Sequence, residues 1–127
     1  TGLDKELIKL YEDGKTIYGG SAGTLIWGFD IKTSLICSDK DKNLVKIKNT
    51  NGLNKIANRD LQVHFNRDQI LEHQEYSKKT DRSIIAIPEE SALLVTENRF
   101  KVIGEKPITY ITKNEYKDFK PNSFILL

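Results

Sequence analysis

The chain has 127 residues, of which 38% are hydrophobic and 30% charged, and its formal net charge is +2. This size and composition predict a single soluble domain over residues 1–127 with a modest core. The balanced charge excludes a strongly basic nucleic-acid binder, no apolar run is long enough to span a membrane, and the lone cysteine excludes an internal disulfide, so the cytoplasm is the expected location.

An amphipathic helix is predicted near the N-terminus, because apolar residues recur at helical spacing from Leu3 to Tyr11. Thr1 and Asp4 fit a capping box at its start, and Gly14 is a suitable residue for its end. A short strand is expected next, over residues 16–19.

The strand leads into Gly19-Gly20-Ser21-Ala22-Gly23, which is followed by a helix-compatible stretch. A serine between small residues at a strand-to-helix turn is typical of a nucleophile elbow. Such a turn strains the serine backbone, and we expect the elbow glycines Gly19, Gly20 and Gly23 to avoid clashes around it. The hydroxyl of Ser21 would lie at a helix N-terminus, where backbone N–H groups favour developing negative charge. The alternative is a tight turn with no chemical role; a phosphate loop is excluded because no G-K-[ST] follows.

Later segments predict more strands than helices. The closely spaced apolar runs in the last third predict antiparallel hairpins rather than further βαβ units. The apolar C-terminus, residues 124–127, is expected to dock against the fold. The predicted fold class is α/β, with a partial doubly wound sheet, a nucleophile elbow and C-terminal hairpins. The expected elements are a surface helix over 67–79 and strands over 44–48, 61–65, 83–87, 92–96, 100–103 and 108–112.

A serine nucleophile requires a general base within hydrogen-bond reach and an acid that orients the base. His64 lies near the end of a predicted strand, where α/β sites are built, whereas His73 lies in the polar helix and is expected to be exposed. Glu89 directly follows a predicted buried strand and could project from the same sheet edge as His64. The other acids in loops or at strand ends are Asp30, Asp39, Asp60, Asp68 and Glu90.

No metal or cofactor is expected. Two histidines without a cysteine pair or an H-E-x-x-H motif do not make a zinc site. Cys37 follows an apolar run and is expected to be a small core residue. The lysines of residues 40–42 and 78–79 are expected on the solvated surface.

Three segments together resemble peptidase E, the α-aspartyl dipeptidases, and the related cyanophycinases. These are serine peptidases whose fold is similar to that of class I glutamine amidotransferases. The resemblance implies hydrolysis of short peptides by acyl transfer, with Ser21 as nucleophile, His64 as base and Glu89 as acid. It also implies that the N–H of Ala22 lies in the oxyanion hole. The segments are Gly20-Ser21-Ala22-Gly23, Val63-His64-Phe65 and Ile87-Pro88-Glu89-Glu90-Ser91.

The chain departs from the family pattern in places that carry no reacting group. Thr24, Val63 and Glu90 stand where the family has alanine, proline and glycine. A Gly-Glu-Thr-Arg segment linked to recognition of the substrate aspartate is not found, so aspartyl specificity is not implied.

The resemblance places this chain in the C-terminal part of a peptidase E-like domain, as if truncated at its N-terminus. The family's first βα units, with a Gly-Gly-Gly-Asn-Thr segment that supplies a second oxyanion N–H, are expected before residue 1. A sheet without those strands would expose an edge, which predicts a homodimer or a complementary N-terminal segment. Two other functions stay open: a catalytically impaired binding or assembly module, and an amidase or esterase on the same scaffold.

Overall fold

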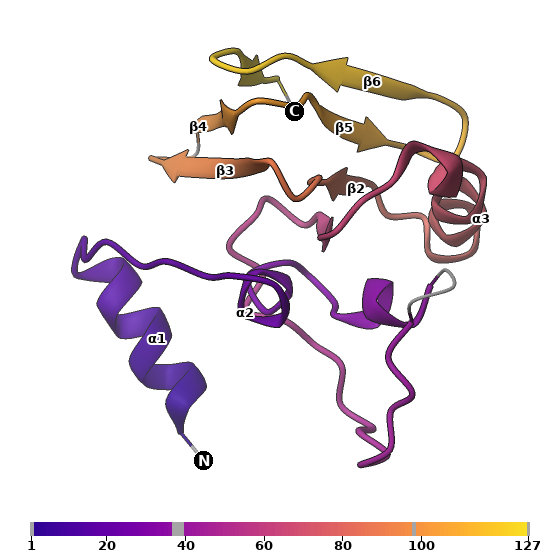
Figure 1. The fold of residues 1–127 in the computed structure, drawn as a ribbon. Helices are drawn as coiled ribbons and strands as arrows, with labels where there is room; N and C mark the ends of the chain where they lie inside the picture. The colour runs from indigo at the N-terminus through magenta and orange to yellow at the C-terminus, as the bar shows by residue number, and fades with distance from the viewer. Residues whose placement is uncertain (1, 37–39, 98, 127) are drawn as a thin grey trace.

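The computed structural model describes residues 2–36, 40–97 and 99–126 (Figure 1). Its N-terminal part is helical and its C-terminal part is built mainly of strands. The helical elements are α1 (Leu3–Glu12), α2 (Ala22–Leu25) and α3 (Ile70–Thr80), with 3₁₀ turns η1 (Lys32–Leu35) and η2 (Arg67–Gln69). The strands are β1 (Asp60–Gln62), β2 (Ile84–Ala86), β3 (Ser91–Thr96), β4 (Arg99–Gly104), β5 (Ile108–Ile111), β6 (Tyr116–Phe119) and β7 (Phe124–Ile125).

The strands form two sheets. The first has the order β1-β2-β5-β6, in which β1 and β2 run parallel and the other neighbours run antiparallel. The second is the antiparallel sheet β3-β4-β7. The chain is therefore a mixed α/β protein with one mixed sheet. Parallel pairing joins only β1 and β2 among the described strands, so the doubly wound, amidotransferase-like arrangement stays a prediction.

Strand β2 is the centre of the core, and its three residues are fully buried. Its side chains alternate between the two faces of the sheet. Ile84 and Ala86 pack with Ile70 of α3 on one face. Ile85 packs on the other face with Val102 of β4, so the second sheet covers that side. The spacing of apolar residues in this short run thus gives one buried strand between two apolar layers.

The C-terminal hairpins are confirmed. Strands β3 and β4 pair over six residues each, and β5 pairs with β6, a strand that the sequence analysis did not predict. The C-terminal segment docks as expected, because β7 pairs with β4 and Ile125 is buried.

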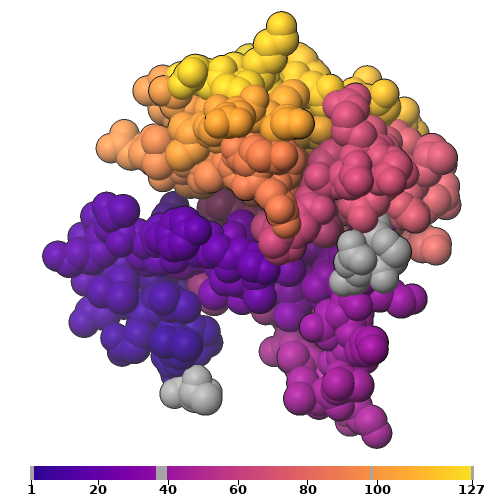
Figure 2. Space-filling view, viewed as in Figure 1, coloured from indigo at the N-terminus to yellow at the C-terminus, as the bar shows by residue number. Residues whose placement is uncertain are grey.

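Two predicted strands are wrong. Residues 16–19 lead to the elbow without strand pairing, and residues 44–48 form an exposed loop. In that loop the side-chain oxygen of Asn43 accepts a hydrogen bond of 2.8 Å from the N–H of Ile47, which closes a turn in place of a strand ladder. Figure 2 shows α1 and this loop region projecting from the body of the molecule. The third predicted strand in this region, 61–65, pairs with β2 through residues 60–62.

Helix α1 agrees with the sequence, but its N-cap is Gly2, with no side-chain hydrogen bond, instead of the expected capping box. Gly14, at a φ of 72°, follows the end of the helix. The lysines of residues 40–42 and 78–79 are exposed as expected. Thr1, Cys37 and Asp39 lie outside the described residues. No helix in the described part of the chain is long and apolar enough to cross a bilayer.

The prediction that His73 is exposed is wrong, because its side chain is fully buried. It lies on one face of α3 with Ile70 and Ser77, at spacings of three and four residues. Its ring meets the ring of Phe65 edge-on at 5.6 Å between centroids, and its Nδ1–H donates to the carbonyl oxygen of Gln69 at 2.6 Å. The helical spacing of these three residues indicates a buried face, which the polar composition of the segment made difficult to recognise from the sequence.

A buried charged cluster joins four segments of the chain. The carboxylate of Asp60 accepts hydrogen bonds from the backbone N–H of Asp30 at 2.9 Å, from the hydroxyl of Tyr76 at 2.8 Å and from Nε of Arg82 at 2.9 Å. The guanidinium of Arg82 also bonds the hydroxyl of Tyr76 at 2.9 Å. Burial, followed by the bond to Asp60, raises the pKa of Tyr76, so this hydroxyl stays a donor. Asp60 thus links the loop after α2, β1, α3 and the segment that enters β2.

We expect Arg82→Met to lower the free energy of unfolding by about 3 kcal/mol, because it leaves the buried carboxylate of Asp60 without its cation. Urea denaturation measures this loss. Lys113→Met is the matched control, because it removes a cation from an exposed pair with Asp81 and should leave the midpoint nearly unchanged. Equal midpoints for the two variants would contradict the structural role of the cluster.

Burial lowers the pKa of His73 below its usual value of about 6.5. The unfolded chain therefore binds a proton at a higher pH than the folded chain does, and stability falls as the pH falls through about 6.5. We expect a larger loss of stability between pH 7.5 and pH 5.5 in the natural chain than in His73→Phe, by up to about 1.4 kcal/mol, because only about one pH unit of this interval lies below the unfolded pKa. Urea denaturation at both pH values tests this, and equal losses would contradict it.

Candidate active site

The elbow is a tight turn at the start of α2. Ser21 is the N-cap of α2, and its backbone has φ 50° and ψ −122°, a conformation that residues other than glycine rarely adopt. The N–H of Gly23 donates to the carbonyl of Gly20 at 2.9 Å, and the hydroxyl of Thr24 donates to the carbonyl of Gly19 at 2.6 Å. These bonds fold the backbone back on itself and leave the side chain of Ser21 exposed.

The glycines of this turn differ in how much they are needed. A Cβ on Gly19 would overlap the carbonyl oxygen of Gly23, and a Cβ on Gly20 would lie 3.1 Å from the hydroxyl of Tyr18. A Cβ on Gly23 would meet no atom within 4 Å. The close approach at Gly19 is therefore the steric constraint of the elbow, and the unusual backbone angles belong to Ser21 itself.

The structure brings Ser21, His64 and Glu89 together. Nε2 of His64 lies 2.9 Å from Oγ of Ser21, and Nδ1 lies 3.0 Å from Oε1 of Glu89. A neutral imidazole with its proton on Nδ1 donates to the carboxylate and accepts the serine proton, which satisfies both contacts. The side chains of His64 and Glu89 are 57% and 73% exposed, so this hydrogen-bonded chain lies at the surface.

Strand pairing explains why His64 and Glu89 meet. Strands β1 and β2 are parallel neighbours, and their pairing extends past the strand ends, where the N–H of Phe65 donates to the carbonyl of Ile87 at 3.1 Å. His64 itself turns out of the strand with φ 53°. Its ring and the carboxylate of Glu89 therefore project from the same edge of the sheet.

The remaining acidic candidates have other environments. Asp30 and Asp60 are buried with Arg82, whereas Asp68 and Glu90 are exposed and make no hydrogen bond to His64. In the described part of the chain, no three His, Cys, Asp or Glu side chains are arranged to hold a metal ion.

Ala22 follows Ser21 as the first residue of α2. The first N–H groups of a helix have no acceptor within that helix, so the N–H of Ala22 is suited to donate a hydrogen bond to an anionic oxygen beside the serine. Ala22 is exposed, as Ser21 is.

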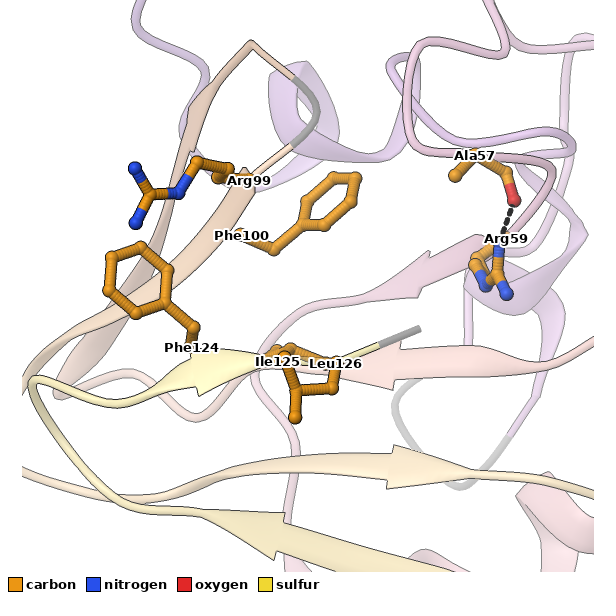
Figure 3. Close-up of a pocket in the computed structure, with 7 residues that line it drawn as sticks. All are labelled: Ala57, Arg59, Arg99, Phe100, Phe124, Ile125 and Leu126. Carbon is orange, nitrogen blue, oxygen red and sulfur yellow. Dashed lines mark hydrogen bonds between the residues drawn. The ribbon is translucent and has the colours of Figure 1, made fainter.

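Two surface hollows of the described chain bear on this assignment. One contains His64 and Glu89 in its wall. The other contains none of the three side chains above, and there the guanidinium of Arg99 stacks 4.6 Å from the ring centroid of Phe124 (Figure 3). Its lining is Ala57, Arg59, Arg99, Phe100, Phe124, Ile125 and Leu126.

The structure predicts opposite effects for two single methyl groups in the elbow. Gly19→Ala should lower the free energy of unfolding by about 1–3 kcal/mol, because its Cβ overlaps backbone that cannot move freely. Gly23→Ala should be neutral or stabilising by up to about 1 kcal/mol, because alanine favours a helix and finds open space there. Thermal denaturation of the pair tests this, and equal stabilities would show that the elbow is not closely packed.

The model of peptidase family S51 matches residues 1–103, a range that contains Ser21, His64 and Glu89. No curated protein matches the chain. The matched range is well over half of the chain. The resemblance carried by the three motifs is thereby confirmed at the level of the family, and the chain belongs to peptidase family S51.

Proposed function

We propose that the chain is a serine peptidase that cleaves short peptides through Ser21, His64 and Glu89. Family membership supports a peptidase in general. The observation that carries the specific assignment is the continuous hydrogen-bonded chain from Oγ of Ser21 through both ring nitrogens of His64 to the carboxylate of Glu89. A serine, a base and an orienting acid in this order are the elements that acyl transfer requires.

In the first half of the reaction, Oγ of Ser21 bonds to the carbonyl carbon of the peptide, and its proton passes to Nε2 of His64. The N–H of Ala22 donates to the oxygen that becomes negative. The carboxylate of Glu89 holds the Nδ1–H and stabilises the imidazolium. The C–N bond then breaks, and Nε2 returns the proton to the leaving amine.

In the second half, water replaces the leaving amine. Nε2 of His64 takes a proton from the water while its oxygen bonds to the acyl carbon. The bond to Ser21 breaks, the proton returns to Oγ, and the acid product leaves. The same three side chains therefore serve both halves with no net change.

The backbone of Ser21 supports this function independently. A residue other than glycine in such a conformation costs about 1–3 kcal/mol and persists where the surroundings impose it, most often at functional sites. A surface serine with no role would gain nothing from this conformation. The conformation presents the hydroxyl to His64 and leaves the following N–H beside it.

A second candidate is a binding or assembly module. It is favoured by α1, which is amphipathic and contains no buried residue, and by Tyr18, which is 90% exposed. Exposed apolar side chains of this kind mark interaction surfaces when they form a patch. The intact contacts of His64 favour catalysis over this alternative.

Hydrolysis of a panel of aminoacyl p-nitroanilides, the aspartyl compound included, tests the assignment. Ser21→Ala should lower kcat by roughly 10⁴- to 10⁶-fold, and His64→Ala should do nearly the same. The double variant should lose little more, because the two residues act as a unit. Glu89→Gln should lower kcat by roughly 10²- to 10⁴-fold, because the amide cannot stabilise the imidazolium.

Asp68→Asn is the matched control for Glu89→Gln, because it removes an exposed carboxylate that does not contact His64. It should keep full turnover. Turnover that persists in Ser21→Ala, or that is lost with Asp68→Asn and kept with Glu89→Gln, would refute the assignment. Absence of turnover in a folded natural chain would favour the binding or assembly module.

A further inference from the structure

A groove with charged walls adjoins the candidate active site. It begins at His64 and Glu89 and continues between the segment after β1 and the loop before β5. Ser21 is not part of it. The groove thus adjoins the candidate site at His64 and Glu89, the two members of the hydrogen-bonded chain that line it. Its lining is His64, Phe65, Asn66, Arg67, Pro88, Glu89, Glu90, Lys106, Pro107 and Thr109.

Arg67 and Glu89, two of the charged residues that line the groove, are already paired. The carboxylate of Glu89 is bonded to His64, and the guanidinium of Arg67 lies 2.6 Å from a carboxylate oxygen of Asp118. The ammonium of Lys106 has no ion pair or hydrogen bond to any described residue. Lys106 is thus the one cation lining the groove, within the described chain, that is available to a ligand.

The backbone that carries Lys106 is held firmly beside Glu89. The N–H of Lys106 donates to Oγ of Ser91 at 3.0 Å, and the hydroxyl of Ser91 donates to the carbonyl of Lys106 at 2.6 Å. The N–H of Glu105 donates to the carbonyl of Glu90 at 2.9 Å. These bonds fix the loop before β5 to the segment after β2, so the position of Lys106 relative to Glu89 is set by the fold.

The proposed reaction determines which part of a peptide meets the groove. The acyl part bonds to Oγ of Ser21, and the leaving amine receives its proton from Nε2 of His64. The residue after the cleaved bond therefore lies against the imidazole. The groove continues from the imidazole toward Lys106, so it receives the leaving-group side of the peptide.

We propose that this groove binds the leaving residue of the substrate and that Lys106 binds a carboxylate on that residue. This inference rests on the proposed function. The substrate class is a short peptide that carries a carboxylate immediately after the cleaved bond, either the free C-terminus or an acidic side chain. Lys106 is then a specificity-determining residue, and its ammonium forms a charge-assisted hydrogen bond.

Glu90 also lines the groove and is exposed. Its negative charge and that of Glu89 balance the positive charges of Arg67 and Lys106, so the groove has a net charge close to zero. Recognition by Lys106 is consequently local and depends on direct contact. Because the site is open to solvent, salt should weaken the contact.

Binding to the Ser21→Ala variant tests the inference without requiring turnover. The probes are the dipeptide Ala-Phe, its C-terminal amide, and Ala-Glu amide, which carries only a side-chain carboxylate. Amide shifts in ¹⁵N spectra give Kd for each. We expect Ala-Phe to bind about threefold to tenfold more tightly than Ala-Phe amide, with shifts at residues 64–67 and 105–106. Tight binding of Ala-Glu amide as well would show that a side-chain carboxylate also serves.

In the Ser21→Ala background, adding Lys106→Gln should abolish the difference in Kd between Ala-Phe and its amide. Adding Lys120→Gln instead should preserve that difference. Lys120 is a matched control, because it is an exposed lysine outside the groove. Equal Kd values for acid and amide, a difference that survives Lys106→Gln, or no binding at residues 64–67 would overturn the inference.

Turnover by the natural chain is scored separately, so the two proposals fail in different ways. If the natural chain is active but its Ser21→Ala variant binds Ala-Phe no more tightly than its amide, only the proposed role of Lys106 is refuted. An acid preference that depends on Lys106 in an inactive chain refutes the peptidase assignment and leaves a carboxylate-binding groove.

Discussion

The buried carboxylate of Asp60 is the interaction on which the arrangement of the site depends. A charge removed from water is costly unless every acceptor is filled, and here a backbone N–H, the Tyr76 hydroxyl and the Arg82 guanidinium fill it. These donors come from the loop after α2, some 30 residues before Asp60, and from α3 and the segment after it, some 16 to 22 residues beyond Asp60. The requirement to satisfy one carboxylate therefore fixes the loop after α2, the second half of α3 and the segment that enters β2 against β1.

The contact between Ser21 and His64 could not fix those segments by itself. Both residues are exposed, and a hydrogen bond in water adds little to stability. Buried contacts hold the segments that carry Ser21 and His64. Leu25 of α2 and Leu61 of β1 belong to the same buried cluster, and the N–H of Asp30 donates to the carboxylate of Asp60. The site is thus a surface contact positioned by a buried frame, which allows Ser21 and His64 to stay accessible.

The sequence predicted the features that depend on local chemistry. Helix α1, the helix predicted over 67–79 (observed as η2 and α3) and the C-terminal hairpins follow from spacing and turn residues. The small residues around Ser21 predicted the tight turn that begins α2. The run at 44–48 was misleading because strand formation requires a partner, which no local pattern supplies. Strand β6 was missed because an edge strand with three exposed residues has little apolar alternation.

The approach of His64 to Glu89 depends on the parallel register of β1 and β2, 24 residues apart at their paired ends. Spacing alone could indicate that both residues follow strands. The resemblance to the family motifs selected Glu89 among several acidic candidates. Lys106 gave no signal at all, because a lysine in a loop is ordinary. Its significance arises from the bonds of Ser91, which place that loop beside Glu89.

Solvent exposure links the groove to catalysis. In the proposed mechanism, solvent screens the charges at this exposed site, so Glu89 stabilises an imidazolium only weakly in the free chain and serves mainly to orient the ring. A peptide bound in the groove as proposed would cover His64 and Glu89 and exclude that water, which would strengthen their interaction when the imidazolium forms. Binding free energy from the contact with Lys106 would then be used partly in the transition state. A carboxylate on the leaving residue should for this reason raise kcat as well as lower KM, a pattern that simple substrate capture does not produce.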